Sequence, residues 1–194
     1  MSGELRDQET QELAKLVRAA QKGEEQALVG ILRKTQARLL KFAYLQTGNA
    51  EIAEELCQEA YIKAFAAIAS LDEPERVVSW LFRILKNLVF DRFRLVSVRS
   101  EKASEDLDLL EDPAVRQEGR EDFLYIRELL QCLEAMDRAV VLAVHLEGYS
   151  YCETAELLGL TEDAVRSRLQ RARKKMLEKA KDGESIPLRR PSKG

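Results

Sequence analysis

The segment Tyr151–Lys175, YCETAELLGLTEDAVRSRLQRARKK, decides the fold of the C-terminal half of this chain. It predicts two helices joined by a tight turn. A small residue, Ala155, lets the two helices approach each other, and Gly159 permits the turn between them. Val165 is a branched apolar residue that seats the second helix against the first. The segment is therefore predicted to form a helix-turn-helix.

Capping signals and periodicity support both helices. Ser150 and Glu153 have the spacing of a capping box at the start of the first helix, and Thr161 is the expected N-cap of the second. At about 100° per residue, four apolar residues of the second helix form one stripe that should be buried. They are Val165, Leu169, Ala172 and Met176.

The opposite face of the second helix is basic. Between Glu162 and Lys181 there are eight Lys and Arg residues against three Asp and Glu, a local balance of +5. The whole chain has 31 basic and 34 acidic residues, so positive charge is concentrated here. Such concentration is typical of a helix that faces DNA. The alternative is a structural hairpin whose basic face is only solvated. The net charge of −3 excludes a histone-like binder.

The rest of the chain predicts an all-α protein of two small domains. Residues 10–93 show helical periodicity without strand-like alternation, and they contain four expected helices. The first domain is assigned to residues 1–97 and the second to residues 123–181. Residues 98–122 are predicted to be a flexible acidic linker, because positions 101–128 contain ten acidic residues and only four basic ones. Residues 182–194 are predicted to be a disordered tail.

Signals for catalysis, metal binding and membranes are weak. The three cysteines, Cys57, Cys132 and Cys152, lack metal-ligand spacing, so we expect buried structural thiols. The single His145 lies in an apolar run, and no nucleophile or phosphate loop accompanies it. We expect no enzyme activity, no cofactor and no metal. Residues 1–25 are polar and the longest apolar run is short, so a cytoplasmic protein without membrane insertion is expected.

Two helices of the first domain have polar surfaces that suit partners. On the third expected helix, from residue 49 to about residue 69, an exposed Ile62 is surrounded by Glu55, Gln58, Glu59 and Lys63. This face either docks on a basic partner helix or is a solvated acidic surface.

The fourth helix, SWLFRILKNLVFDRFR at residues 79–94, is apolar around most of its circumference. Its thin polar strip suits the binding of nucleic acid whose bases are unstacked. The alternative is a solvated strip in which Asp91 simply pairs with Arg94. The strip consists of Arg83, Lys86, Asn87, Phe90, Asp91 and Arg94.

The order of these pieces resembles a bacterial sigma factor of the small extracytoplasmic-function (ECF) type, from about residue 13 to residue 179. Residues 55–65, ELCQEAYIKAF, are similar to the helix that docks on core RNA polymerase. Residues 79–84, SWLFRI, with Asn87, Asp91 and Arg94, are similar to the helix that melts and recognises the minus-ten element. Residues 148–169 are similar to the helix-turn-helix that recognises the minus-thirty-five element.

The resemblance implies a function and a set of contacts. The protein would bind the clamp helices of the largest polymerase subunit, and would select promoters that are double-stranded at minus-thirty-five and melted at minus-ten. A non-template base would enter a pocket formed by Asn87 and the loop at residues 70–78. Small sigma factors commonly have an anti-sigma partner as well, and no residue here marks its interface.

The implied residues fall into three groups. The polymerase contacts are Glu55, Gln58, Glu59 and Ile62. The minus-ten contacts are Arg76, Trp80, Arg83, Lys86, Asn87, Phe90 and Arg94. At minus-thirty-five, we expect Arg166, Ser167, Gln170 and Arg171 at base edges or adjacent phosphates, and Arg168, Arg173, Lys174 and Lys175 to attract the DNA backbone.

Three departures and one alternative accompany the resemblance. The loop sequence Glu75-Arg76-Val77-Val78 lacks the usual aromatic residue, and residues 133–138 lack the usual proline. Gln170 occupies a position that is apolar in some relatives, so a promoter sequence does not transfer. The alternative is a helix-turn-helix transcription regulator that does not bind polymerase as a sigma subunit. Such a regulator needs an α/β domain upstream, which the all-helical first half disfavours.

Overall fold

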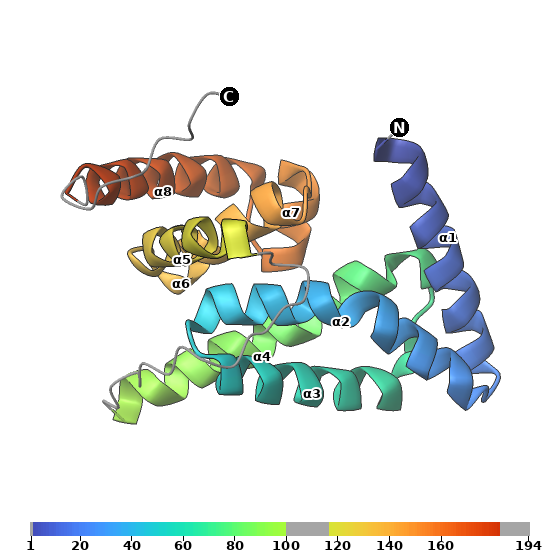
Figure 1. The fold of residues 1–194 in the computed structure, drawn as a ribbon. Helices are drawn as coiled ribbons and strands as arrows, with labels where there is room; N and C mark the ends of the chain where they lie inside the picture. The colour runs from blue at the N-terminus through green and yellow to red at the C-terminus, as the bar shows by residue number, and fades with distance from the viewer. Residues whose placement is uncertain (1, 100–116, 183–194) are drawn as a thin grey trace. The chain divides into compact units, whose positions relative to one another are not determined.

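The computed structural model describes residues 2–99 and 117–182, which form eight α-helices and contain no β-strand (Figure 1). The prediction of an all-α protein is confirmed. The chain divides into two compact units, Met1–Leu110 and Glu111–Gly194, called here the N-terminal and C-terminal units. None of the helices in the described ranges is long and apolar enough to cross a membrane.

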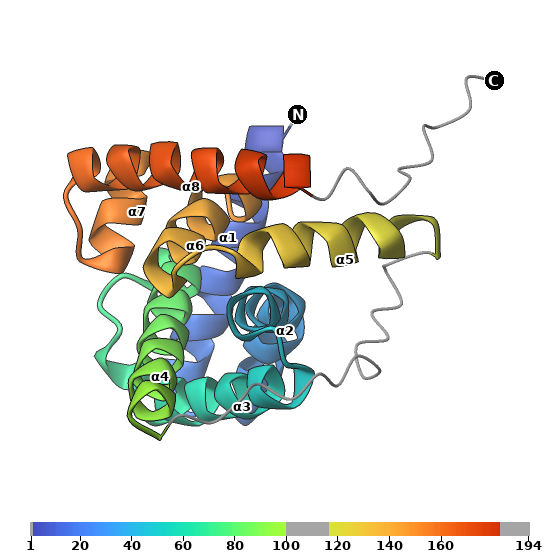
Figure 2. The ribbon, with the colours of Figure 1, turned by 90° about the vertical axis from the view of Figure 1, so that its left-hand side faces the viewer.

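The N-terminal unit contains four helices: α1 (Ser2–Gln21), α2 (Glu25–Thr47), α3 (Ala50–Ala66) and α4 (Val77–Arg99). Helices α2, α3 and α4 pack against one another, and α1 packs against α2 (Figures 1 and 2). Two short 3-10 turns, Ile68–Ser70 and Pro74–Arg76, connect α3 to α4. Helix α1 begins well before the expected residue 10, and α4 begins two residues before the expected Ser79.

Helix α4 forms the centre of this unit, as its apolar sequence predicts. Leu81, Phe82 and Leu85 are completely buried. The ring of Phe82 meets that of Phe42 in α2 edge to face, with 5.2 Å between ring centroids. An edge-to-face aromatic pair contributes favourable free energy beyond that of the apolar area it buries. The contact therefore fixes the position of α4 against α2.

The break between α2 and α3 is formed by local capping. Gly48 has a φ of 73°, and its N–H donates to the carbonyl of Tyr44 at 2.7 Å. The side chain of Asn49 accepts a hydrogen bond from the backbone N–H of Ile52 at 2.9 Å. A left-handed glycine and an Asn N-cap are the usual signals for ending one helix and starting the next. These two caps therefore end α2 and begin α3.

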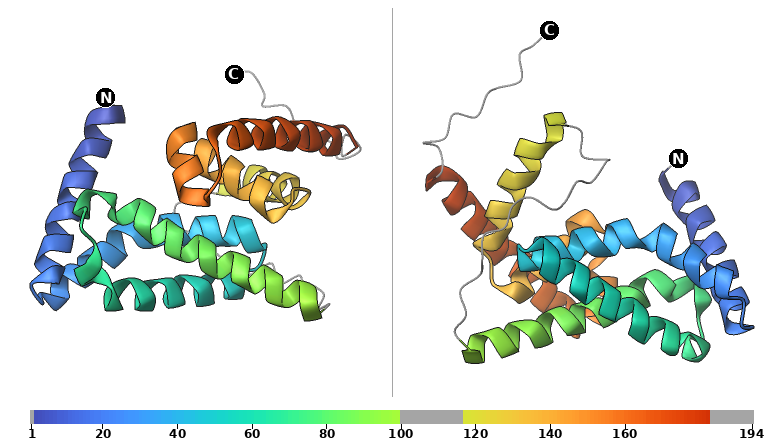
Figure 3. Two further views of the ribbon diagram at one scale, coloured as in Figure 1. Left: turned by 180° about the vertical axis from the view of Figure 1, so that it is seen from behind. Right: turned by 60° about the horizontal axis from the view of Figure 1, so that its bottom comes forward.

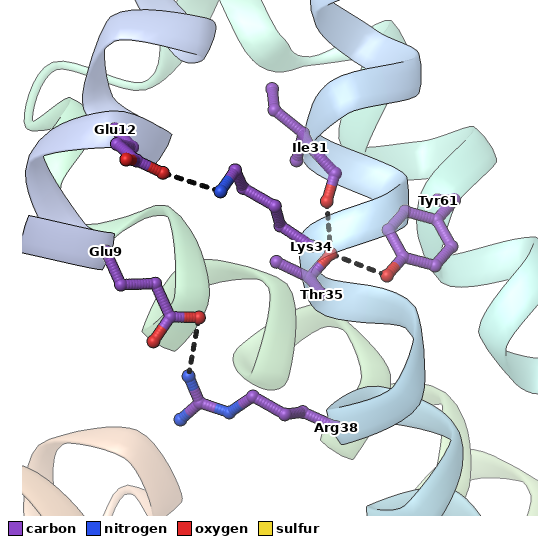
Figure 4. A network of polar contacts seen from close by, with 7 residues as sticks. All are labelled: Glu9, Glu12, Ile31, Lys34, Thr35, Arg38 and Tyr61. Carbon is purple, nitrogen blue, oxygen red and sulfur yellow. Dashed lines mark hydrogen bonds and ion pairs between the residues drawn. The ribbon is translucent and has the colours of Figure 1, made fainter. Parts of the chain in front are cut away.

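Polar contacts join α1, α2 and α3 (Figure 4). Lys34 pairs with Glu12 of α1 at 2.6 Å on the surface. In the buried layer beneath, the hydroxyl of Thr35 donates to the carbonyl of Ile31 at 2.8 Å and lies 2.7 Å from the hydroxyl of Tyr61. Because Thr35 has used its proton, Tyr61 donates to Thr35. Burial raises the pKa of Tyr61 to about 12, so it stays a donor at neutral pH.

The C-terminal unit contains α5 (Gln117–Gln131), α6 (Ala135–Val141), α7 (Tyr151–Leu158) and α8 (Glu162–Asp182). A π-helical turn, Leu142–Leu146, follows α6. Helix α8 packs against α5, α6 and α7 (Figure 3). The core of the unit is formed by side chains from α5, α6, α7 and α8 and from the turn after α5. They include Leu130, Leu133, Ala139, Val140, Val165 and Ala172.

Two sequence predictions need correction. Of the thiols expected to be buried, Cys57 is buried and Cys132 is half-buried, but Cys152 is exposed. Cys152 lies in the first turn of α7 between exposed Tyr151 and Glu153, so the core does not cover this turn. Helix also occupies both ends of the expected linker at residues 98–122. The remaining part of that linker and the tail after residue 182 lie outside the described residues.

The Thr35–Tyr61 hydrogen bond gives a first testable prediction. Tyr61→Phe should lower the free energy of unfolding of the N-terminal unit by about 1 kcal/mol, because a buried acceptor on Thr35 loses its donor. Urea unfolding followed by the fluorescence of Trp80, the single tryptophan, measures this. Tyr151→Phe, an exposed position in the other unit, is the control. Equal unfolding midpoints for both variants would contradict the assignment.

Candidate nucleic-acid interface

The helix-turn-helix forms as the sequence predicts. At the start of α7, Ser150 Oγ accepts from the backbone N–H of Glu153 at 3.2 Å, and the Glu153 carboxylate accepts from the N–H of Ser150 at 2.8 Å. Gly159 ends α7 in the left-handed conformation, with a φ of 68°. The side chain of Thr161 then accepts from the N–H of Ala164 at 3.2 Å. Both predicted caps are confirmed, and together they set the angle between α7 and α8.

Helix α8 presents a basic face away from its buried stripe. Val165 and Ala172 are completely buried, and Leu169 and Met176 are half-buried. All but one of the predicted minus-thirty-five residues are exposed on the remaining surface. These are Arg166, Ser167, Gln170, Arg171, Arg173, Lys174 and Lys175. Their exposure fits a surface that receives a polyanion.

Arg168 is the exception. Its Nη1 lies 2.5 Å from Oδ1 of Asp137 in α6, and the Asp137 side chain is 4% exposed. The guanidinium is therefore used inside the unit, where it fixes α8 against α6. Sequence reasoning missed Asp137 and grouped Arg168 with the residues that attract DNA. Its spacing of three residues from buried Val165 places Arg168 at the edge of the buried stripe, and this was the available signal.

The residue next to Asp137 joins α6 to α5. Arg138 donates from Nε to the carbonyl of Leu130 and from Nη2 to that of Leu133, both at 2.9 Å. Burial lowers the pKa of Arg138 to about 10, so its guanidinium remains charged at neutral pH. The carbonyl of Leu130, near the end of α5, also accepts from the backbone N–H of Leu133 at 3.1 Å, and Leu133 lies in the turn after α5. Arg138 therefore ties the end of α5 and this turn to α6. The turn that lacks the family's usual proline is thus held by a buried arginine.

The ion pairs on the exposed face of α8 are loose. Arg166 lies 3.6 Å from Asp163 and above the ring of Tyr151, and Lys174 lies 3.9 Å from Glu178. Exposed pairs of this kind contribute little to stability, at most about 1 kcal/mol. These cations can therefore exchange their carboxylate partners for DNA phosphates at small cost.

The polar strip of α4 is a cluster of cations. Arg83 and Arg94 are exposed, and Lys86 between them is half-buried. Burial lowers the pKa of Lys86, and the charges of Arg83 and Arg94 lower it further. The expected pair of Asp91 with Arg94 is present at 3.3 Å. These neighbouring cations repel one another, and a bound anion would offset this repulsion. The strip therefore suits a phosphate backbone.

The other predicted minus-ten residues surround this strip. Asn87 is exposed, and the aromatic side chains of Trp80 and Phe90 are half-buried. Arg76 precedes α4 and pairs with Glu73 at 2.7 Å. The predicted set therefore combines exposed cations, an amide and partly accessible rings on one helix and the turn before it, as recognition of unstacked bases requires.

The predicted partner face of α3 is exposed and apolar at its centre. Ile62 is 70% exposed, the highest value among the large hydrophobic residues that the structure describes. Glu55 and Gln58 are exposed beside it, and Glu59 is half-buried and pairs with Lys63 at 2.8 Å. An exposed isoleucine bordered by acids suits a partner with an apolar patch and basic surroundings.

Comparison with known proteins identifies the family. Sigma-70 region 2 matches residues 31–97, and Sigma-70 region 4 matches residues 123–176. The ECF RNA polymerase sigma factor SigM of Mycobacterium tuberculosis is 31% identical over 163 residues, which cover 84% of this chain and 82% of that protein. The chain belongs to the ECF sigma factors.

Further relatives agree with this assignment. The ECF sigma factor SigW of Bacillus subtilis is 25% identical over 182 residues, covering 88% of this chain and 97% of SigW. The sigma factor RpoE of Bartonella quintana, solved with the anti-sigma factor NepR, matches with a TM-score of 0.65 and 25% identity over 77% of this chain and 94% of RpoE. CnrH, solved with the cytosolic domain of CnrY, shares the fold with a TM-score of 0.66 at 23% identity, over 88% of this chain and 97% of CnrH.

As an ECF sigma factor, this protein directs promoter-specific initiation of transcription. The alternative of a helix-turn-helix regulator that does not act as a sigma subunit is not favoured, because both sigma-70 regions are matched in one chain.

The Asp137–Arg168 pair gives a second prediction. Asp137→Asn should lower the opening free energy of α8 by about 2 kcal/mol, because a largely buried guanidinium loses its charged partner. Amide hydrogen exchange at Val165 and Ala172 measures it. Asp163→Asn is the matched control, since the Asp163 side chain is 92% exposed. Equal protection of the buried α8 amides in both variants would show that the pair does not hold α8.

Proposed function

We propose that this ECF sigma factor divides promoter recognition between its two units. The N-terminal unit docks on core RNA polymerase and holds the melted minus-ten element, and the C-terminal unit binds the double-stranded minus-thirty-five element. The observation that carries the proposal is that each unit exposes one cation-rich helical surface opposite a buried apolar stripe, on α4 and on α8. The protein contributes no catalytic chemistry of its own and works in the cytoplasm, where polymerase acts.

Helix α8 is proposed to enter the major groove. Four residues near its N-terminal end, Arg166, Ser167, Gln170 and Arg171, contact base edges or the adjacent phosphates. Arg173, Lys174 and Lys175 lie further along the helix and attract the DNA backbone. Arg168 acts indirectly, because its pair with Asp137 fixes the position of α8.

Helix α4 and the loop before it are proposed to receive the melted strand. Arg83, Lys86 and Arg94 hold phosphates, while Asn87 and the loop at residues 70–78 form a pocket for an extruded base. Extruding a base costs a few kcal/mol, which contacts in the pocket and to polymerase must offset. The half-buried rings of Trp80 and Phe90 supply apolar surface for stacking.

The α3 face is proposed to bind the clamp helices of the largest polymerase subunit. Ile62 is the apolar anchor, and Glu55, Gln58 and Glu59 supply acceptors for a basic helix. An exposed large apolar side chain at the centre of a polar rim is the usual composition of an energetically dominant contact.

An anti-sigma partner is also proposed. RpoE of Bartonella quintana was solved in complex with the anti-sigma factor NepR, and RpoE has the same fold as this chain. We infer that a separate protein of this kind regulates the present sigma factor.

Base contacts and backbone contacts on α8 should separate experimentally. Arg171→Ala should weaken binding to cognate promoter DNA by about 1–3 kcal/mol and leave binding to scrambled DNA nearly unchanged. Lys175→Ala should weaken both equally and reduce the salt dependence of binding. Fluorescence anisotropy of holoenzyme on both DNAs, at several salt concentrations, measures this. Identical losses on the two DNAs for Arg171→Ala would reject its assignment to a base.

The docking face should depend on Ile62. Ile62→Glu should weaken the affinity for core polymerase by roughly tenfold or more, because a charge replaces the apolar anchor. Val29→Glu is the control, since Val29 is also an exposed apolar residue of the same unit but lies on α2. Affinity is measured by titrating labelled sigma variants with purified core polymerase. If both variants bind core polymerase as the unaltered protein does, the α3 face is not the docking surface.

A further inference from the structure

Helix α1 holds the segment that connects α3 to α4. Gln21, the last residue of α1, donates from Nε2 to the carbonyl oxygen of Ile68 at 3.1 Å and to that of Leu71 at 2.9 Å. One turn earlier, Arg18 forms an ion pair with Glu75. Helix α1 thus contacts both 3-10 turns of this segment, at residues 68–70 and 74–76.

The connecting segment needs such support. Its regular structure is limited to two 3-10 turns of three residues each, which close few hydrogen bonds of their own. Ile68, Leu71 and Pro74 are nevertheless buried, so the path of the backbone is fixed at three points. The carboxamide of Gln21 has two N–H donors and uses both on this backbone. A carbonyl held in this way cannot shift without losing its partner.

Nothing in the family match assigns α1 this role. Sigma-70 region 2 matches residues 31–97, which include the connecting segment and α4 but not α1. The hydrogen bonds of Gln21 therefore run from outside the matched region to the loop inside it. Helix α1 also carries completely or nearly completely buried residues, such as Leu13 and Val17, that pack in the core. The two contributions, packing and loop support, can be separated by substitution.

We propose that α1 is a positioning element for base selection at the minus-ten element. Gln21 fixes the backbone at Ile68 and Leu71, and Arg18 adds an ion pair to the exposed side chain of Glu75. The pocket formed by this loop and Asn87 thereby keeps one shape and prefers one base. Neither residue touches DNA. The inference rests on the proposed assignment of this loop to the minus-ten pocket. A pocket rejects the wrong base because that base leaves polar groups of the pocket without hydrogen-bond partners. Such rejection requires the polar groups of the pocket to be held in place to within about 0.5 Å.

Gln21→Glu is the sharpest substitution. It preserves the shape of the side chain but replaces both N–H donors by an oxygen that repels the two carbonyls. Gln11→Glu is the matched control, because it makes the same change of charge on an exposed position of the same helix. Holoenzyme is reconstituted with each variant. Its affinity is measured for four single-stranded oligonucleotides that carry the minus-ten element of a transcribed promoter and differ only at the extruded base.

The expected result is a change in selectivity. The ratio of affinities between the best and the worst base should fall roughly fivefold to tenfold for Gln21→Glu and stay unchanged for Gln11→Glu. Affinity for core polymerase and the thermal unfolding midpoint are measured in parallel. A lower midpoint with the base ratio intact would make α1 an element of folding only, and would overturn the inference.

A charge swap keeps the test independent of stability. Arg18→Glu and Glu75→Arg should each reduce the base ratio, and the double variant should restore it, because the ion pair is re-formed with reversed charges. If Arg18→Glu, Glu75→Arg and Gln21→Glu all keep the wild-type ratio of affinities between the best and the worst base, the role of α1 is overturned, while the assignment of the loop to the pocket stands. A wild-type holoenzyme that does not distinguish the four bases would overturn the assignment of the loop to the pocket, and the role of α1 with it.

Discussion

The N-terminal unit depends on the packing of α4 against α2 and α3. Leu81, Phe82 and Leu85 are completely buried in this contact, and Phe42 meets Phe82 edge to face. Burying each such side chain contributes about 1.5–3 kcal/mol, so α4 is held along much of its length. Its remaining polar strip therefore lies on a rigid support. The proposed binding of a single extruded base at this surface needs such a support, because small displacements weaken every contact.

The C-terminal unit solves the same problem with a different helix. Helix α8 buries Val165 and Ala172 and exposes its cations on the other side. The pair between Asp137 and Arg168 adds a directional contact, because it joins charged groups of α6 and α8 at 2.5 Å. In both units, one helix is at once part of the core and the surface that is proposed to face DNA. A small chain can thereby carry two proposed recognition surfaces on helices that also form its core.

Local features were predictable from the sequence, and contacts between distant residues were not. The caps at Ser150 and Thr161 and the break at Gly48 are encoded within a few residues, so short patterns identify them. The hydrogen bonds from Gln21 span 47 and 50 residues, and the pair of Arg168 spans 31. No periodicity states which polar residue meets which across such distances.

The misplacement of Arg168 has a similar physical cause. A helical wheel gives the direction of Cβ, but a long arginine side chain can turn back toward the core and bury its charge against a partner. Prediction of the exposed Ile62 succeeded because the residues on the same face before it, Glu55, Gln58 and Glu59, are polar or charged, which disfavours a core position.

The most direct test of the account is run-off transcription with purified core polymerase on fragmented genomic DNA, with and without this protein. We expect new, discrete transcripts that depend on the added protein. Their start sites would lie at a constant distance from shared minus-ten and minus-thirty-five sequences, because both recognition surfaces belong to one chain. If the protein neither bound core polymerase nor produced any new transcript, its action as a sigma subunit would be contradicted.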